Sequence, residues 1–550
     1  MRRLSFLRGQ LGFALLLAAA APAMVVFCWH PVIATIGDDS VSYLVLARYF
    51  SPWDPDPLAA RWAPYFSNFP PLFPLLLAIT GGAYELLVGH LVVAAGAVAS
   101  LVLAHAYARE RLSNEAGALA VTFLFLMLPG MWLGLMGILS ESTYLALSMA
   151  ALLYEAKRVG PHSRASAYVV LGLWIATALL ARTAAFALVA AYAVRMTVEA
   201  LRARRFPAPR AWLALAIPAA AQLAWLASRP ALAVTAYQEW VAQLAQRWLT
   251  QPVATFAESW RDLSRGWIGD FAADAAGGGA AAFAFGLVAA ASLAGAVRAA
   301  IRGRLDGWYV LASVAMLFVW VFNEDNSRRL LFPLLPLALL HAAETVHAVA
   351  QRVRSRASAA IAPLAFAFLA VMVFPASALV LRKAFDRDPY FPGLGYSPAA
   401  MKDYYGVVND RLAGEEAYRG ACVLAGMSYL GLWTPEGARV MWVRPEYIAV
   451  LGRREGVALY LRWDRPALAR EIRRTRTDFV VASRQYKNDL ATFAGDAFVW
   501  MVRDIPSYLE PVAALPDISR GDFLLLKVDA ARLDRYIRDG ERASPAPGAG

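Results

Sequence analysis

The amino-acid sequence predicts a polytopic α-helical membrane protein with a C-terminal α/β domain outside the membrane. Hydrophobic residues make up 59% of the 550 residues and charged residues 17%, whereas a soluble domain is typically about 45–50% apolar and about 25% charged. Apolar segments long enough to cross a bilayer, about 17–25 residues, recur through the first two-thirds of the chain. Beyond about residue 382, charged residues become frequent and short apolar runs alternate with amphipathic stretches.

The hydropathy pattern predicts about eleven transmembrane helices. Basic clusters precede the first predicted span and follow every even-numbered one. Because cytoplasmic loops carry an excess of Lys and Arg, the N-terminus is expected in the cytoplasm, and the segments 34–89 and 229–278 and the chain after about residue 382 are expected on the outer face. The predicted spans cover residues 11–33, 90–108, 116–133, 139–157, 166–181, 184–200, 211–228, 279–300, 308–322, 329–350 and 358–381.

The formal net charge of +12 does not indicate a nucleic-acid partner, because the basic residues form short clusters between apolar spans. That distribution is typical of membrane topology rather than of a phosphate-binding face. We therefore expect membrane lipids, and no nucleic acid, among the partners of this protein.

The first outer segment begins with Gly37-Asp38-Asp39. Two adjacent carboxylates beside a bilayer are too costly to bury unpaired, so they are expected to face water, a metal ion or a substrate. Asp39 or Ser40 can also N-cap an amphipathic helix that would lie on the membrane. The apolar stretch Leu72–Thr80 is too short to span and is expected to re-enter the membrane or lie flat.

Asp54-Pro55-Asp56 matches the Asp-x-Asp pattern by which many sugar transferases hold a nucleotide sugar through a metal ion. The match is weak, because a three-residue pattern in a proline-rich turn arises readily by chance. Nucleotide sugars are also cytoplasmic, whereas this segment is expected on the outer face. The pattern is therefore not interpreted as a nucleotide-sugar site.

The predicted domain boundaries are 1–382 for the membrane region, 383–540 for the α/β domain and 541–550 for a disordered tail rich in Pro, Ala and Gly. The α/β domain has no Gly-x-Gly-x-x-Gly and no phosphate-binding loop, so nothing in it indicates a nucleotide site. Its predicted helices are Met401–Leu412 and Pro466–Arg474, and its predicted strands are Ala421–Ala425, Arg439–Val443, Asp478–Ala482, Phe498–Val502 and Phe523–Val528.

Ionisable residues gather at the predicted outer ends of the spans, where they indicate function by default. Each also has a structural interpretation: Asp39 or Ser140 could cap a helix, Glu141 could favour the helix dipole, and Arg182 could be a solvated or membrane-anchoring turn residue. Arg328 or Arg329 could simply pair with Glu324 or Asp325. The gathered residues are Asp38 and Asp39, the sequence Ser140-Glu141-Ser142, Arg182, and Arg328 and Arg329.

These side chains together suggest a group-transfer reaction. A carboxylate beside a hydroxyl acceptor can act as a general base, and arginines can neutralise a departing phosphate. The outer compartment has no nucleotide donors, and the cytoplasmic loops are too short to form a nucleotide-binding domain. The activated group is therefore expected to arrive on a membrane lipid, as in a polyprenyl-phosphate sugar.

Four strings resemble the GT-C glycosyltransferases, namely GDDSVSYLVLARYF, YFSNFPPLFPLLLAITGG, SESTYLAL and SRRLLFPLLPLALL. The similarity is to bacterial relatives of the protein O-mannosyltransferases and of the lipid A aminoarabinose transferase. It implies a GT-C-like fold in the bacterial inner membrane, with a periplasmic C-terminal domain. It also implies a polyprenyl-phosphate sugar donor, and a lipid, glycan or protein acceptor in the synthesis of lipopolysaccharide or another cell-envelope glycan.

The resemblance implies roles for individual residues. An outward aspartate after the first span is catalytic in this family, which corresponds here to Asp38 or Asp39, and the second acidic residue of the family corresponds to Glu141. A divalent metal, Mg²⁺ or Mn²⁺, is implied as a cofactor, with Asp39 and Glu141 as its ligands. Arg328, Arg329 and Arg182 would contact the donor phosphate. The chain lacks the luminal insert of the protein mannosyltransferases, which puts a protein acceptor in doubt.

Two other functions compete with an inverting glycosyltransferase. A transporter or flippase of lipid-linked sugars would place ionisable residues near the bilayer midplane and would show paired repeats. The charged residues inside the predicted spans, such as Arg195 and Glu344, instead lie toward the cytoplasmic ends, and no internal repeat is evident. The third function is that of a non-catalytic assembly partner.

Overall fold

The computed structural model describes residues 2–29, 39–112, 114–160, 162–229, 234–272, 279–320, 324–352, 358–385, 413–459, 465–483, 505–515 and 523–543. Its contacts divide the chain into two compact units. The first unit comprises residues 1–31 and 64–385, and the second comprises 32–63 and 386–550. The segment 32–63, which the sequence analysis placed within the membrane region, therefore folds with the C-terminal domain.

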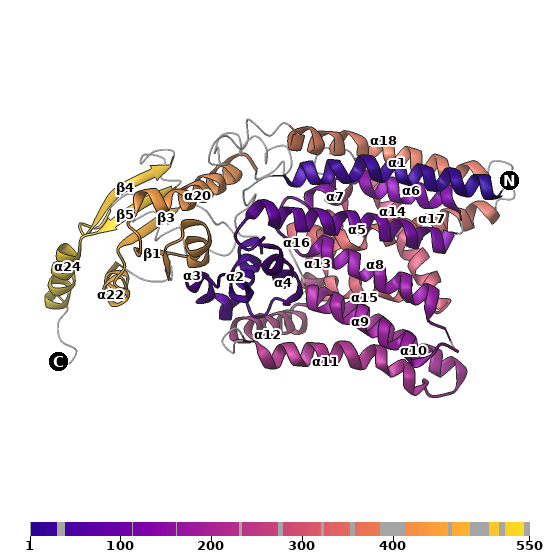
Figure 1. Cartoon of the computed structure of the whole chain (residues 1–550), viewed down its shortest axis with the longest axis horizontal. Helices are drawn as coiled ribbons and strands as arrows, with labels where there is room; N and C mark the ends of the chain where they lie inside the picture. Colours follow the sequence, from indigo (N-terminus) through magenta and orange to yellow (C-terminus); the bar gives the residue numbers. More distant parts are fainter. Residues whose placement is uncertain are drawn as a thin grey trace. The chain divides into compact units, whose positions relative to one another are not determined.

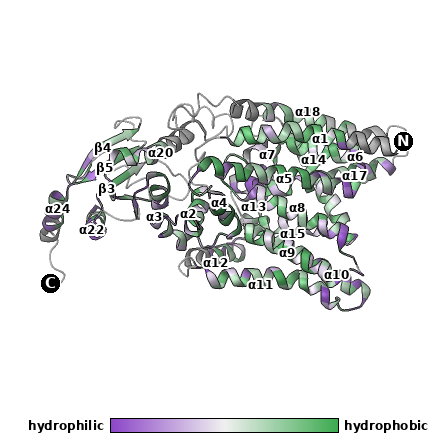
Figure 2. Ribbon diagram, in the orientation of Figure 1, coloured by the Kyte–Doolittle hydropathy of each residue, from purple (hydrophilic) through white to green (hydrophobic). Residues whose placement is uncertain are grey.

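A helix occupies each of the eleven predicted spans (Figure 1). Among the described residues, six segments are long and apolar enough to cross a membrane, and the number of helices that do so stays a prediction. Figure 2 shows the hydrophobic character of these helices. The helices in the eleven predicted spans are α1 (Arg2–Cys28), α5 (Leu86–Leu112), α6 (Glu115–Met127), α8 (Glu141–Arg158), α9 (Ala165–Ala181), α10 (Phe186–Ala203), α11 (Leu213–Ser228), α14 (Gly279–Ile301), α15 (Leu305–Trp320), α17 (Leu335–Arg352) and α18 (Ser358–Phe385).

Further helical elements complete the first unit. α4 coincides with the predicted short helix, and it ends at Gly81, whose φ of +85° favours glycine. Whether α4 re-enters the membrane or lies flat stays a prediction. The further elements are η1 (Ala63–Phe66), α4 (Leu72–Thr80), α7 (Pro129–Leu133), η2 (Thr183–Ala185), η3 (Pro209–Trp212), α12 (Val234–Thr250), α13 (Pro252–Ala272), α16 (Glu324–Leu331) and η5 (Phe332–Leu334).

Small residues bring α5 and α8 together. A Cβ added at Gly96 would lie 2.9 Å from Ser142 Oγ and 3.0 Å from Thr143 N, so α8 approaches α5 as closely as glycine allows. Ser100 Oγ donates a hydrogen bond to the carbonyl of Ser142 (2.8 Å), and Ser142 Oγ donates to the carbonyl of Val93 (3.0 Å). Small residues and interhelical hydrogen bonds of this kind are typical of membrane helices. They fix the first turn of α8, which carries Glu141.

The second unit contains a five-stranded sheet of order β2-β1-β3-β5-β4 (Figure 1). β1 pairs in parallel with β2 and β3, and β5 pairs antiparallel with β3 and β4. The strands are β1 (Arg439–Trp442), β2 (Glu455–Ala458), β3 (Phe479–Ser483), β4 (Leu509–Leu515) and β5 (Phe523–Val528). The helical elements are α2 (Ser40–Phe50), α3 (Pro57–Ala60), α20 (Ala413–Trp433), α21 (Pro445–Tyr447), the π-helical turn η6 (Ile448–Gly452), α22 (Arg465–Thr475) and α24 (Ala530–Ala543).

Helices cover both faces of this sheet. Alternate residues Val480 of β3 and Leu524 of β5 join one buried core with Leu468 of α22 and Leu533 of α24. The opposite face packs on α20, where a Cβ added at Gly426 would lie 2.6 Å from the Phe523 ring. Because both faces are covered, β3 and β5 are nearly continuous apolar runs, as is typical of strands buried on both faces.

The predicted strand Ala421–Ala425 is wrong, because these residues lie within α20. A buried apolar run of this length has no periodicity that separates strand from helix. The predictions at Met401–Leu412 and Phe498–Val502 lie outside the described residues, as does the predicted tail beyond Ala543. The sequence analysis also missed β4, an edge strand that contains Pro511 and a register shift at that residue.

The predicted helix after Asp39 is present as α2, but its expected position on the membrane surface is wrong. Every residue from Ser40 to Arg48 is buried. α2 packs against α3, α21 and η6 of its own unit. The apolar spacing of Val41, Leu44, Val45 and Ala47, which predicted an amphipathic helix, instead reflects packing inside the protein, where Ser40 and Ser42 are also buried.

Candidate functional site

Three of the predicted site residues meet at a buried cluster in the first unit. Glu141, the first residue of α8, is 1% exposed. Its Oε2 lies 3.0 Å from Nη1 of Arg182, and its Oε1 accepts a hydrogen bond from Nε of Arg329. Arg182 Nη1 also donates to Ser140 Oγ at 3.0 Å. We call Glu141, Arg182, Arg329 and Ser140 the arginine cluster.

The fold explains how each member is positioned. Ser140 precedes α8 and makes no side-chain capping hydrogen bond, so its hydroxyl is used for Arg182 rather than as the helix cap. Arg182 follows α9 with an extended backbone and is only 8% exposed, so it is neither a solvated turn residue nor a membrane anchor. Arg329 lies in the last turn of α16 and pairs with Glu141, 188 residues earlier in the chain.

The members of the arginine cluster differ in exposure. One carboxylate contacts two guanidinium groups, and a guanidinium group can also donate to phosphate oxygens. The side chain of Arg329 is 21% exposed, compared with 10% for Arg182 and 1% for Glu141. Because Arg329 is the most exposed of the three, an anion that entered the cluster would contact it first. Glu141 already orients the guanidinium group of Arg329.

Arg328 has different surroundings from Arg329. A Cβ added at Gly269 of α13 would lie 3.4 Å from Cδ and 3.6 Å from Nε of Arg328, so this side chain lies along α13. One turn earlier, a Cβ added at Gly266 would lie 2.8 Å from the backbone nitrogen of Arg328. The two glycines let α16 lie directly against α13. The predicted phosphate contact at Arg328 stays a prediction.

Gly266→Ala is expected to displace α16 and with it Arg329. The added methyl group meets backbone rather than a flexible side chain, so we expect a loss of about 1–3 kcal/mol in stability and a lower melting temperature of the purified protein. The matched control is Gly286→Ala, because a Cβ at Gly286 of α14 would meet no atom within 4 Å. Equal melting temperatures for both variants would contradict this account of the contact between α13 and α16.

Asp39 belongs to the second unit and is half-buried directly before α2. Asp38 lies outside the described residues. The carbonyl of Asp39 accepts a hydrogen bond from the backbone nitrogen of Tyr43 (2.9 Å), but its side chain makes no capping hydrogen bond. The structural interpretation of Asp39 as a helix cap is therefore not realised through its carboxylate.

Glu141 does not fit the role of a metal ligand. Both of its carboxylate oxygens face arginine nitrogens, which would repel a divalent cation and compete for the same lone pairs. Within the described ranges, no three His, Cys, Asp or Glu side chains gather as a metal site requires. We derive no step of the reaction through a metal ion.

The sequence analysis missed a second buried group of charges, at the other end of α8. Glu155 pairs with Arg195 of α10 and with Arg111 of α5, and Arg111 in turn lies 3.7 Å from Asp306. Asp306, the second residue of α15, is fully buried and pairs with Arg304.

Arg304 extends this group to α17, because it also binds Glu344 (2.6 Å). His341 lies within 3.8 Å of both Asp306 and Glu344. Only the clustering of charges at predicted span ends could have indicated this group.

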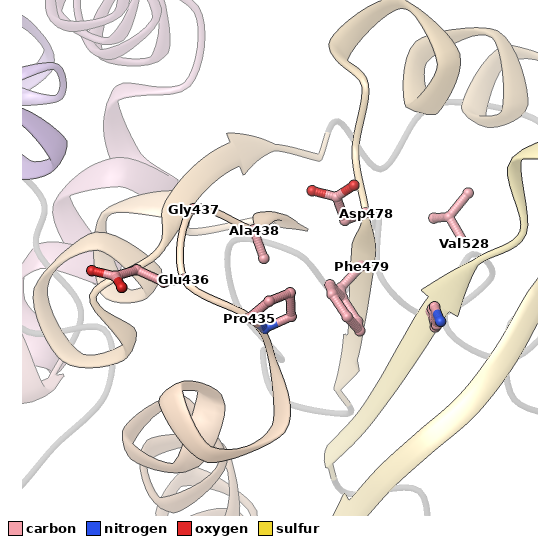
Figure 3. Close-up of a pocket in the computed structure, with 8 residues that line it drawn as sticks. Pro435, Glu436, Gly437, Ala438, Asp478, Phe479 and Val528 are labelled. Carbon is pink, nitrogen blue, oxygen red and sulfur yellow. The ribbon is translucent and has the colours of Figure 1, made fainter.

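A hollow of about 310 Å³ lies at the amino ends of β1 and β3 in the second unit, and Figure 3 shows the residues that line it. Its charged lining residues are Glu436, Asp478 and Lys527. Asp478 Oδ2 accepts a hydrogen bond from the backbone nitrogen of Arg439 (2.9 Å), so this carboxylate links the amino ends of β1 and β3. We assign no catalytic role to this hollow.

No protein-family model and no curated protein sequence matches the chain. Solved structures do match it. The structure of ArnT from Cupriavidus metallidurans in the apo state has a TM-score of 0.50 and 14% sequence identity, and the match covers 95% of this chain and 99% of ArnT. The chain has the GT-C fold.

Two further structures with the GT-C fold match. ArnT from the same organism bound to undecaprenyl phosphate has a TM-score of 0.50 and 13% identity, with 95% of this chain and 99% of ArnT covered. The Archaeoglobus fulgidus oligosaccharyltransferase tethered with an acceptor peptide has a TM-score of 0.48 and 14% identity, with 85% of this chain and 68% of that chain covered. The likeness to ArnT shows the fold, while the arginine cluster is a feature of this chain's own side chains.

Proposed function

We propose that this protein is a membrane glycosyltransferase that moves a sugar from a polyprenyl phosphate to an acceptor on the outer face of the membrane. The observation that carries the proposal is the arginine cluster, in which one buried carboxylate contacts and orients two arginines. The GT-C fold, shared with a protein solved with undecaprenyl phosphate bound, supports the same donor class.

Arg329 and Arg182 would bind the phosphate that joins the lipid to the sugar. Arginine suits this task, because its planar guanidinium stays charged and donates several hydrogen bonds to phosphate oxygens. Negative charge grows on the phosphate as the glycosidic bond breaks, so donors that are already oriented stabilise the transition state more than the ground state. Glu141 holds the two guanidinium groups in place between turnovers.

Asp38 or Asp39 would act as the general base. The acceptor hydroxyl attacks the anomeric carbon, its proton passes to the carboxylate, and the bond between that carbon and the phosphate oxygen breaks. The bonding electrons leave with the polyprenyl phosphate. A single displacement of this kind inverts the anomeric centre. The acceptor is a lipid, a glycan or a protein of the bacterial cell envelope.

The test is transfer from defined polyprenyl-phosphate sugars in membranes that contain the protein. Asp38→Asn and Asp39→Asn are made separately, and loss of the base is expected to lower kcat by about 10²–10⁴-fold in one of them. The matched control is Asp54→Asn, because Asp54 is an exposed carboxylate of the same segment. Wild-type activity in both single variants would end the proposal. Mass spectrometry of surface glycans from a deletion strain and its parent would identify the acceptor.

A further inference from the structure

Arg48 is the one charged side chain among the buried residues of α2. It is 4% exposed, and it lies in the last turn of the helix. Nη1 donates to Oδ2 of Asp56 at 2.9 Å, and Nη2 donates to the carbonyl of Val450 at 3.1 Å. Val450 is 402 residues further along the chain, in the π-helical turn η6. A single guanidinium group therefore joins the segment after the first span to the C-terminal domain.

Asp56 is shared between two tasks. Its Oδ2 accepts from Arg48, while its Oδ1 accepts from the backbone nitrogens of Leu58 (2.9 Å) and Ala59 (3.4 Å) at the start of α3. Both oxygens of this carboxylate are thus used within the protein, which gives the second aspartate of the Asp-x-Asp pattern a structural role. The carboxylate fixes the turn between α2 and α3 to the same arginine that reaches η6.

A second ion pair joins the same two segments at the surface. Arg61 contacts Oε1 of Glu455, whose Oε2 accepts from Nε of Arg439 at 2.9 Å. The side chain of Arg61 is 53% exposed, so this pair is screened by water and contributes little. Arg48 is buried, and its guanidinium cannot exchange its protein partners for water without moving the helix. Arg48 is therefore the stronger of the two attachments.

We propose that Arg48 is a positioning residue for the reaction, and that it acts by holding α2 on the C-terminal domain. α2 begins directly after Asp39, so the orientation of the helix sets the position of the Asp39 carboxylate. This inference rests on the proposed role of Asp38 or Asp39 as the base. Under this proposal the C-terminal domain helps to orient the general base.

The geometry gives the size of the effect. Arg48 lies nine residues after Asp39, which is about 13 Å along a helix. A tilt of roughly 5° about the Arg48 end would move the start of α2 by about 1 Å, and a misplacement of about 1 Å can cost roughly 10²-fold in rate. Binding of donor and acceptor uses other groups, so the loss falls on kcat rather than on KM.

The experiment compares Arg48→Gln and Arg48→Lys with the exposed control Arg61→Gln in the full-length protein. We expect Arg48→Gln to lower kcat by roughly 10²-fold while KM for the donor changes less than about threefold. Hydrogen exchange of the α2 amides is expected to become at least about tenfold faster, because the buried attachment is lost. Arg48→Lys keeps the charge but has a single donor nitrogen. Its kcat and its exchange rate are expected to lie between those of the wild type and of Arg48→Gln. Arg61→Gln is expected to match the wild type in both measurements.

Hydrogen exchange and activity separate the possible failures. Unchanged exchange in α2 of both Arg48 variants would overturn the attachment itself. Faster exchange with wild-type kcat would overturn the positioning role. Absence of transfer by the wild-type protein would overturn the proposed function, and with it the catalytic consequence, while the exchange data would still decide the attachment. If Arg48→Gln does not fold, Arg48→Lys decides each point by the same two measurements.

Discussion

Glu141→Gln is expected to destabilise the protein by about 3–5 kcal/mol, because it removes the shared acidic partner of a buried ion-pair cluster. Here two guanidinium groups, those of Arg182 and Arg329, would face each other without a carboxylate between them. The melting temperature of the purified protein measures the loss. Transfer activity is expected to fall as well, because the two arginines are no longer held in one orientation.

An added anion provides a sharper test of the same cluster. Polyprenyl phosphate is expected to raise the melting temperature of Glu141→Gln more than that of the wild type, because its phosphate replaces the missing negative charge. The matched control is Glu115→Gln. Glu115 is likewise the first residue of a helix and pairs with Arg109 at 3.6 Å, but that arginine is 36% exposed, and the substitution is expected to cost less than about 1 kcal/mol. Equal costs for the two substitutions would contradict the account of the arginine cluster.

Asp306→Asn is expected to be comparably destabilising, by about 3–5 kcal/mol. Asp306 is fully buried, its Oδ1 accepts from the backbone nitrogen of Gly307 (3.0 Å), and its carboxylate faces Arg304 and Arg111. The asparagine can keep the hydrogen bond from Gly307, but it cannot neutralise the two arginines. The melting temperature again measures the loss.

Asp306→Asn is expected to leave the affinity for polyprenyl phosphate unchanged in the fraction of the protein that is folded. Glu141 and Glu155 lie fourteen residues apart on α8, about 21 Å, so the second group of charges is at the far end of the helix from the arginine cluster. The control is Glu199→Gln, because Glu199 is half-exposed and pairs with Arg195 four residues earlier on the same helix. We expect it to cost less than about 0.5 kcal/mol. A weaker affinity of Asp306→Asn for polyprenyl phosphate would show that the two ends are coupled.

The two groups of charges also bear on the competing functions. Both lie at helix ends: Glu141 is the first residue of α8, and Asp306 is the second residue of α15. A carrier that moves a sugar across the bilayer needs ionisable groups near the midplane. The placement of these two groups at helix ends is therefore not the arrangement that a carrier requires.

Local sequence determines a large part of this protein. Hydropathy over about twenty residues predicts where helices form, because a segment that spans a bilayer must be apolar along its whole length and must satisfy its own backbone hydrogen bonds. The cost of placing charge beside a membrane also singled out Glu141, Arg182 and Arg329 without any knowledge of their contacts. Each of these inferences depends on neighbours in the chain, so no tertiary information is needed for them.

Only the tertiary structure decided which of these residues meet. The pairing of Glu141 with Arg329 joins residues 188 positions apart, and the contact of Arg48 with the Val450 carbonyl joins residues 402 positions apart. Neither partner has a local pattern that identifies the other. The same limit explains why α2 was expected on the membrane surface although it is buried in the C-terminal domain. Hydropathy reports that a side chain avoids water, but burial against lipid and burial against protein have the same signature, and only the packed fold separates them.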